Sequence, residues 1–102
     1  MSSVRRGIEG ELFVAEWLTE RGWVVGSRRH IKGPGDLLAI HPDDGAVWLV
    51  EVKKAKDLWQ QFRRADRAAM KALPLPAGAE LWAVNVLPRK QLRWEPESAW
   101  PS

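Results

Sequence analysis

Apolar residues recur with helical spacing over the first part of the chain, from Ser3 to Arg21. The serine that begins this stretch can cap the first turn, and Gly22 can end the helix in a left-handed conformation. The apolar positions expected on one helical arc are Ile8, Leu12, Ala15 and Leu18. Glu11 falls inside that arc, so we expect its carboxylate to point where a core residue should.

Three later stretches have the apolar content and the alternation of strands. They are Trp23 to about Arg28, about Asp36 to His41, and Ala46 to Lys53. A four-residue loop "PDDG" between the last two pairs His41 with Ala46 and sets Asp36 across from Glu51. A two-residue turn would instead set Asp36 across from Lys53. Either register puts Asp36, Glu51 and Lys53 on one face of the sheet, because side chains alternate with period two.

The second half of the chain predicts one more helix and one or two strands. Asp57 can cap a helix that runs until Pro74, and "ELWAVNVL" reads as a strand after a Pro/Ala linker. "PRKQLRW" is a candidate for a further short strand, and residues 95–102 are expected to be flexible unless Trp94 or Trp100 docks. The element order predicts an α/β fold, a small mixed central sheet flanked by helices, in a single domain over residues 1–102.

Composition narrows the classes of partner and metal. Sixteen Lys and Arg against thirteen Asp and Glu give a net charge of +3, which suits an anionic partner. The absence of cysteine excludes disulfides and thiolate metal sites, so that a metal would be held by oxygen or histidine ligands, which favours a hard ion such as Mg²⁺. No apolar run approaches the roughly 18 residues of a membrane span, and we expect a cytoplasmic protein with no membrane partner.

Carboxylates on otherwise apolar faces are the main chemical signal. Buried Glu11, Asp36 and Glu51 would suffer desolvation and mutual repulsion, which a bound divalent cation relieves. Mg²⁺ usually takes one or two protein carboxylates, so Asp36 and Glu51 suffice, and Glu11 completes the site or holds a second ion. The Lys53 ammonium could orient a metal-bound water or neutralise charge in the transition state. This set of residues suits phosphodiester hydrolysis.

The stretch "GPGDLLAI…VWLVEVKK" resembles the aspartate and Glu-x-Lys signature of the PD-(D/E)xK nuclease superfamily. Gly35 is a departure, because it separates Pro34 from Asp36 where the signature usually joins Pro and Asp. The glutamate on the N-terminal helix, the "ERGWVV" junction and the Glu-x-Lys hairpin are most similar to archaeal-type Holliday junction resolvases. The match covers roughly Arg5 to Lys56.

The resemblance implies a restriction-endonuclease-like core and a DNA endonuclease that depends on Mg²⁺, with Mn²⁺ as a substitute. It implies a homodimer that nicks opposing strands of a four-way DNA junction symmetrically. It assigns metal binding to Glu11, Asp36, Glu51 and the Val52 carbonyl, and catalysis to Lys53 together with the three carboxylates. Glu11 has an alternative role, because it could pair with Arg5 or Arg6 as a structural salt bridge.

Basic residues near both ends of the expected site are candidates for binding DNA phosphates. They are Arg5, Arg6, Arg28, Arg29, Lys32 and Lys54. Two other functions stay open: a repair or restriction-like nuclease of the same fold acting on flapped, nicked or duplex DNA, and a non-catalytic DNA-binding module.

Overall fold

The structure is a computed structural model that describes residues 3–28 and 33–102. Its helices and strands, in chain order, are α1 (Ser3–Glu20), β1 (Val24–Ser27), β2 (Leu37–Ile40), β3 (Val47–Lys53), α2 (Leu58–Gln61), α3 (Arg64–Lys71), β4 (Glu80–Leu87) and β5 (Gln91–Pro96). Short 3₁₀ turns follow the last two strands, at Pro88–Lys90 and Glu97–Ala99. None of the described helices is long and apolar enough to cross a membrane.

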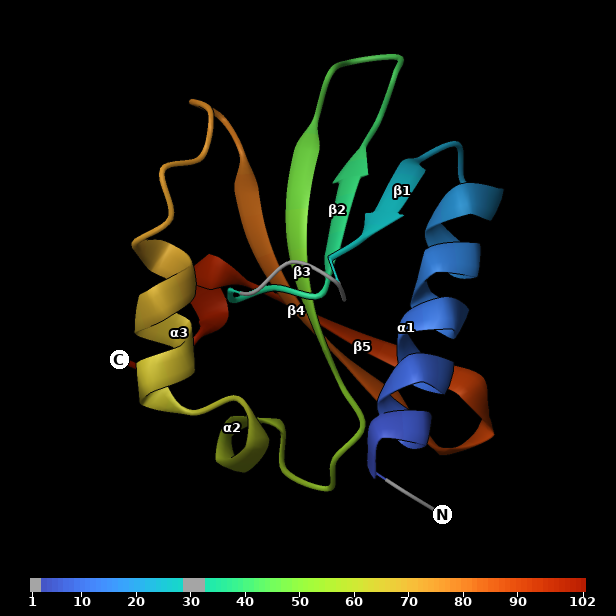
Figure 1. The fold of residues 1–102 in the computed structure, drawn as a ribbon, viewed down its shortest axis with the longest axis vertical. Coiled ribbons are helices and arrows are strands. Elements are labelled where there is room, and N and C mark those ends of the chain that lie inside the picture. Colours follow the sequence, from blue (N-terminus) through green and yellow to red (C-terminus); the bar gives the residue numbers. More distant parts are fainter. Residues whose placement is uncertain (1–2, 29–32) are drawn as a thin grey trace.

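The strands form one mixed sheet in the order of the sequence, β1-β2-β3-β4-β5. The pair β3 and β4 is parallel and the other pairs are antiparallel. Parallel neighbours need a crossover connection, which α2 and α3 provide. Helix α1 lies on one side of the sheet and α3 on the other (Figure 1). The expected fold, a small mixed sheet flanked by helices, is therefore confirmed.

The hairpin between β2 and β3 has the register predicted for the four-residue loop. Leu37 is opposite Val50, and the His41 N–H donates to the Ala46 carbonyl at 2.9 Å. The alternative two-residue turn is wrong. Continuing this register by one residue sets Asp36 across from Glu51, on the face of the sheet that α2 and α3 cover.

Each face of the sheet has its own apolar core. Buried residues on the α1 side are Val14, Leu18, Leu37, Ala39, Val50, Val84 and Val86. Those on the α2/α3 side are Leu49, Leu58, Phe62, Met70, Leu81, Ala83 and Trp100. The separation follows from the alternation of side chains along β3 and β4, which sends successive residues to opposite cores.

The expectation for which side of α1 faces the sheet is wrong, because the helix is rotated about its axis relative to the expected orientation. Leu12, expected inside, is 55% exposed, whereas Gly10, Val14 and Leu18 are buried. The helix turns this side to the sheet because it also carries two large aromatic side chains that pack on the same core. Glu11 therefore lies at the edge of the buried side, partly exposed, and not in the core.

The single helix expected after β3 is also wrong, because the chain breaks into α2 and α3 at Phe62 and Arg63. The side chain of Phe62 is fully buried, and its carbonyl accepts a hydrogen bond from the Arg67 guanidinium. The Asp66 carboxylate accepts the Arg63 N–H at 3.3 Å and so caps the start of α3. Hydrogen bonds with the side chains of Arg67 and Asp66 thus replace backbone hydrogen bonds that are lost where the helix is interrupted.

The C-terminal residues, expected to be flexible, belong to the folded domain. Strand β5 pairs along β4, and Trp100 is 7% exposed in the core on the α2/α3 side. The Trp100 indole N–H donates to the Glu95 carbonyl at 2.9 Å, and its ring meets Phe62 edge-on at 4.9 Å. Docking of Trp100 is the condition under which order was expected, and it is met.

Candidate active site

Asp36 lies immediately before β2, and its carboxylate is bound to the neighbouring strand. The Val52 N–H donates to Asp36 Oδ2 at 2.7 Å, and the Asp36 N–H donates to the Val50 carbonyl at 2.8 Å. The carboxylate takes the place of the backbone acceptor that a longer β2 would supply to β3. The hydrogen bond from Val52 therefore fixes the position of Asp36 Oδ2 at the start of β2, beside the end of β3.

Gly35 explains the departure from the Pro-Asp signature. Its φ is +89°, and a Cβ at this position would lie 2.7 Å from Leu49 Cδ1. A side chain here would therefore be strained by the backbone angle and would also clash with the core. The glycine lets the chain cross closely over Leu49 and enter β2 with Asp36 beside Glu51.

Glu51 is the most perturbed ionisable group of the site. It is 9% exposed, and its Oε2 lies 3.2 Å from Lys53 Nζ. Burial and then the Asp36 carboxylate raise the pKa of Glu51 to about 7, although Lys53 and a backbone hydrogen bond from Gly35 act in the opposite direction. Lys53 therefore compensates the charge of this carboxylate only in part, and a divalent cation beside Asp36 would supply further positive charge.

Two cavities meet at Asp36 and Lys53. The first, about 330 Å³, is also lined by Glu51 and by Phe62, Asp66 and Ala69 of the α2/α3 side. The second, about 500 Å³, is also lined by Glu11, Val52, Lys54 and Gln61. The structure thus brings Asp36, Glu51 and Lys53 together in one cavity, and it places Glu11 in the adjacent cavity, on the other side of Asp36.

The carboxylates gathered here are of the chemical type that binds a divalent cation. Among the described residues, no group of three or more His, Cys, Asp or Glu side chains is placed to hold a metal ion. Asp36 and Glu51 nevertheless supply the one or two carboxylates that Mg²⁺ usually takes from a protein. The N–H and C=O of a strand residue point to the same neighbouring strand, so the Val52 carbonyl points toward Asp36, as its N–H does.

Two residues of the cavities were not found from the sequence. Asp66 of α3 lines the cavity of Glu51, and Gln61 of α2 lines that of Glu11. The position of Asp66 depends on the chain break at Phe62 and Arg63, which no helical pattern signals. The capping position of Asp66 is a local signal, but it indicates a helix start and not a site.

The predicted DNA-binding residues have different surroundings. The guanidinium of Arg28 donates to the Pro34 carbonyl at 2.6 Å, so it supports the loop that leads to Asp36. Lys54 is exposed and lines the cavity of Glu11. Arg29, Lys32 and the side chains of Arg5 and Arg6 lie outside the described residues, as does the alternative pairing of Glu11 with either arginine.

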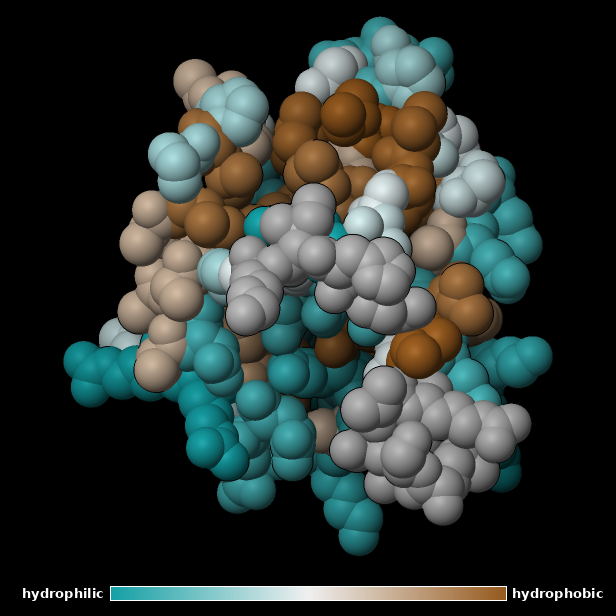
Figure 2. Space-filling view, viewed as in Figure 1, coloured by the Kyte–Doolittle hydropathy of each residue, from teal (hydrophilic) through white to brown (hydrophobic). Residues whose placement is uncertain are grey.

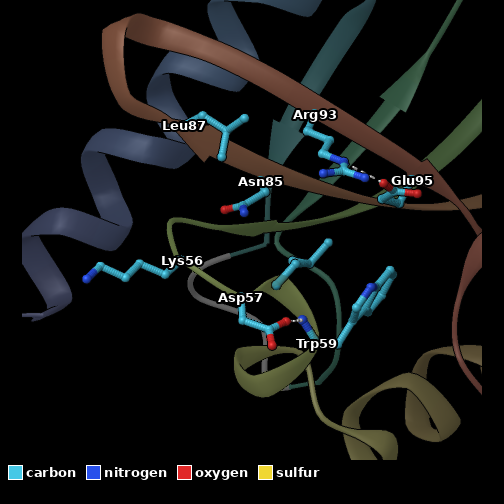
Figure 3. Close-up of a pocket in the computed structure, with 8 residues that line it drawn as sticks. Lys56, Asp57, Trp59, Asn85, Leu87, Arg93 and Glu95 are labelled. Carbon is cyan, nitrogen blue, oxygen red and sulfur yellow. Dashed lines mark hydrogen bonds and ion pairs between the residues drawn. The ribbon is translucent and has the colours of Figure 1, made fainter.

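Figure 3 shows a third cavity, of about 320 Å³. Asn85 in its wall is the register neighbour of Lys53, and its amide bonds both the N–H and the carbonyl of Ala55, at 3.0 and 2.9 Å. These bonds hold the chain that leaves β3 and so fix the end of the strand that carries Lys53. On one wall, Arg93 and Glu95 of β5 form an ion pair at 3.0 Å. The Trp59 indole lies on the opposite wall (Figure 3).

Polar surface surrounds this end of the molecule. Hydrophilic side chains cover the front around α2 and the end of β3, whereas apolar side chains gather over the opposite end of the hairpin between β2 and β3 (Figure 2). The exposed Val24 and Ile40, which are paired across β1 and β2, contribute to the apolar end. The candidate site therefore opens in the polar half.

Comparison with known proteins identifies the fold. Neither a family model nor a curated protein sequence matches the chain. Among solved structures, the chain is similar to Hjc of Archaeoglobus fulgidus, a Holliday junction resolvase from an archaeal hyperthermophile. The TM-score is 0.72 at 20% sequence identity, and the match covers 91% of this chain and 74% of Hjc. The small mixed five-stranded sheet with its helices thus has the fold of Hjc, in agreement with the similarity to archaeal-type resolvases expected from the sequence.

Proposed function

We propose that this protein is a metal-dependent DNA endonuclease that resolves four-way junctions. The observation that carries the proposal is the grouping of Asp36, Glu51 and Lys53 in one cavity of a fold similar to that of Hjc. Asp36 is oriented by the Val52 N–H, and Glu51 is buried with an incompletely compensated charge. Structural ion pairs rarely need opposed carboxylates in an apolar setting, whereas a metal site does.

The ligands have distinct roles in this proposal. Asp36, Glu51 and the Val52 carbonyl hold Mg²⁺, or Mn²⁺ as a substitute, and Glu11 contributes from the adjacent cavity. The ion supplies Lewis acidity toward a phosphodiester and lowers the pKa of a water. Lys53, held by Glu51 at 3.2 Å, presents a fixed ammonium that orients the attacking water and neutralises charge on the phosphate.

Two other functions share parts of this geometry. A repair or restriction-like nuclease would use the same site on flapped, nicked or duplex DNA, because a fold hosts many substrates. A non-catalytic DNA-binding module would keep the fold alone, and the buried Glu51 beside Asp36 is the observation against it. The resolvase is preferred because of the fold shared with Hjc and the two-fold symmetry of a four-way junction.

The test is cleavage of a labelled four-way junction beside matched duplex and flap substrates in Mg²⁺. We expect paired nicks in the junction, and a loss of rate of about a hundredfold or more in Lys53→Ala. Lys71→Ala is the matched control, because this lysine lies at the exposed end of α3, away from the cavity. Cleavage of all substrates alike would indicate a less selective nuclease, and binding without any Lys53-dependent cleavage would indicate a binding module.

A further inference from the structure

The hairpin that joins β4 to β5 has an unusual backbone. Leu87 is paired with Gln91, and Arg89 and Lys90 between them have φ angles of 63° and 58°. They are the only non-glycine residues with positive φ among the described residues. The left-handed region costs a residue with a side chain about 1–2 kcal/mol. Gly and, less readily, Asn adopt positive φ at low cost, so Arg-Lys is an unfavourable pair for these two positions of the three-residue loop Pro88 to Lys90.

Contacts within the protein do not compensate for this strain. Both side chains are exposed, and in the described part of the chain neither makes a hydrogen bond or an ion pair. Strained residues of this kind persist where the residue type serves a purpose other than folding. The feature that Arg89 and Lys90 share is a long, positively charged side chain held at the tip of a hairpin.

The hairpin tip lies at the same edge of the sheet as the candidate site. Strands β3 and β4 are parallel with Lys53 beside Asn85, so both strands approach this edge with their C-terminal ends. The tip turns back beside α1 (Figure 1). Arg89 is four positions after Asn85, and the chain turns after Leu87, so at no more than about 3.3 Å per residue its reach is at most roughly 13 Å beyond Lys53.

A groove of about 630 Å³ lies between the hairpin tip and α1, and Lys54 in its lining also lines the cavity of Glu11 and Asp36. The basic residues of its lining are Arg89 and Lys90 from the hairpin and Lys54, the residue that follows Lys53, and apolar residues of the hairpin and α1 lie beside them. Its α1 side is lined by Glu9 and Glu16, among other residues. A phosphate would be repelled from the α1 side and attracted to the hairpin side, so charge selects one wall of the groove for a nucleic-acid backbone.

We propose that Arg89 and Lys90, together with Lys54, form a second DNA-binding element that holds the arm adjacent to the cleaved phosphate. This inference rests on the proposed function, because it takes DNA as the substrate. Each DNA strand carries one phosphate per about 3.4 Å of helix axis, so a reach of at most roughly 13 Å corresponds to contacts within about four nucleotides of the cleavage point. The contacts are with the phosphate backbone and carry no base sequence.

The double variant Arg89→Asn/Lys90→Gly tests the inference by separating stability from binding. It installs two residues that tolerate positive φ better than Arg and Lys do, and it removes two charges. We expect a higher melting temperature and weaker binding of a labelled four-way junction in Ca²⁺, with the slope of log affinity against log salt concentration reduced by about 2. A contact with purely structural value would lower both stability and binding.

Matched variants keep the outcome interpretable. Arg64→Gln/Lys71→Gln removes the same charge from α3, far from the groove, and should leave the salt slope within about 0.5 of the wild-type value. Arg89→Gln/Lys90→Gln removes the charge with the strained turn retained, and should weaken binding without raising the melting temperature.

The outcomes separate this inference from the proposed function. If wild-type protein binds the junction and both hairpin variants bind equally well, the hairpin element is overturned while the nuclease stands. If the α3 variant loses as much affinity as the hairpin variants, the effect is one of total charge and the inference also fails. If wild-type protein binds no DNA, the proposed function fails first.

Discussion

Glu51 is the residue at which the requirements of folding and of the proposed chemistry conflict. Burial and Asp36 raise its pKa to about 7, whereas an unfolded chain would give a glutamate about 4.3. Between these values the folded protein binds a proton that the unfolded chain releases. The contribution of Glu51 to stability is therefore greatest at low pH and declines as the pH rises through about 7.

Glu51→Gln should consequently stabilise the metal-free protein at pH 8 and have a smaller effect at pH 5. The amide has a similar shape and carries no charge, so it removes the cost of ionising a buried carboxyl. We expect a rise in melting temperature of several degrees at pH 8, since about 1 kcal/mol corresponds to 4–8 °C in a domain of this size. Thermal unfolding in EDTA at the two pH values measures it.

Two comparisons make this prediction specific. Glu20→Gln, at the exposed end of α1, should change the melting temperature equally little at both pH values. Mg²⁺ should raise the melting temperature of wild-type protein at pH 8 and should raise that of Glu51→Gln much less, because the proposed metal site of the folded state includes Glu51. An equal shift at pH 5 and pH 8 would contradict the role assigned to ionisation.

At the residue scale, the sequence predicted which side chains lie together in the candidate site but not all of their neighbours. Asp36, Glu51 and Lys53 could be placed on one face because the alternation of a strand is strict and a hairpin register has few choices. The position of Glu11 was less certain, because a helix can rotate on its axis to bury its larger side chains. Asp66 could not be found, because its place in the cavity depends on a chain break.

Among the elements, the tight segment that leads into β2 should be the most sensitive to substitution. Gly35→Ala forces a Cβ to within 2.7 Å of Leu49 and strains a backbone with φ of +89°. We expect a loss of about 2–3 kcal/mol in the free energy of unfolding, measured by urea denaturation, because the strain and an overpacked core add. Cleavage should decrease as well, since Asp36 is the next residue.

Gly78→Ala is the matched control for this substitution. Gly78 has a similar φ of +86°, but a Cβ there meets nothing within 4 Å, so this variant reports the backbone strain alone. The difference between the two variants isolates the contact with Leu49. Equal losses of stability, with cleavage unchanged in both, would show that the close approach at Gly35 does not position the site.

Elements that depend only on local sequence were predicted correctly, whereas elements that depend on contacts distant in sequence were not. The hairpin between β2 and β3 followed from local turn residues, and its register was correct. The order of the C-terminal segment depends on Trp100 reaching Phe62, a partner distant in sequence, and local composition does not report such a contact. The division of one apolar periodicity into α2 and α3 has the same cause, because Phe62 leaves the helix to enter that core.

For the whole molecule, each chain carries one group of Asp36, Glu51 and Lys53, whereas symmetric resolution of a junction needs two nicks. Two chains related by a two-fold axis would supply two sites to the two opposed strands. We therefore expect the protein to have twice its chain mass of 11.6 kDa in solution, as measured by light scattering. A monomer that still makes paired nicks would contradict this arrangement.

Mixing active and inactive chains tests whether the two sites act in one complex. On a plasmid with an extruded cruciform, wild-type protein should give mainly linear product, because both strands are cut before the complex dissociates. Addition of excess Lys53→Ala chain, followed by exchange of subunits, should give mainly nicked circles, because a mixed dimer cuts one strand. If the share of linear product stays constant while the total rate falls, the chains act independently, and the cavity of Asp36, Glu51 and Lys53 is a complete nuclease in a single copy.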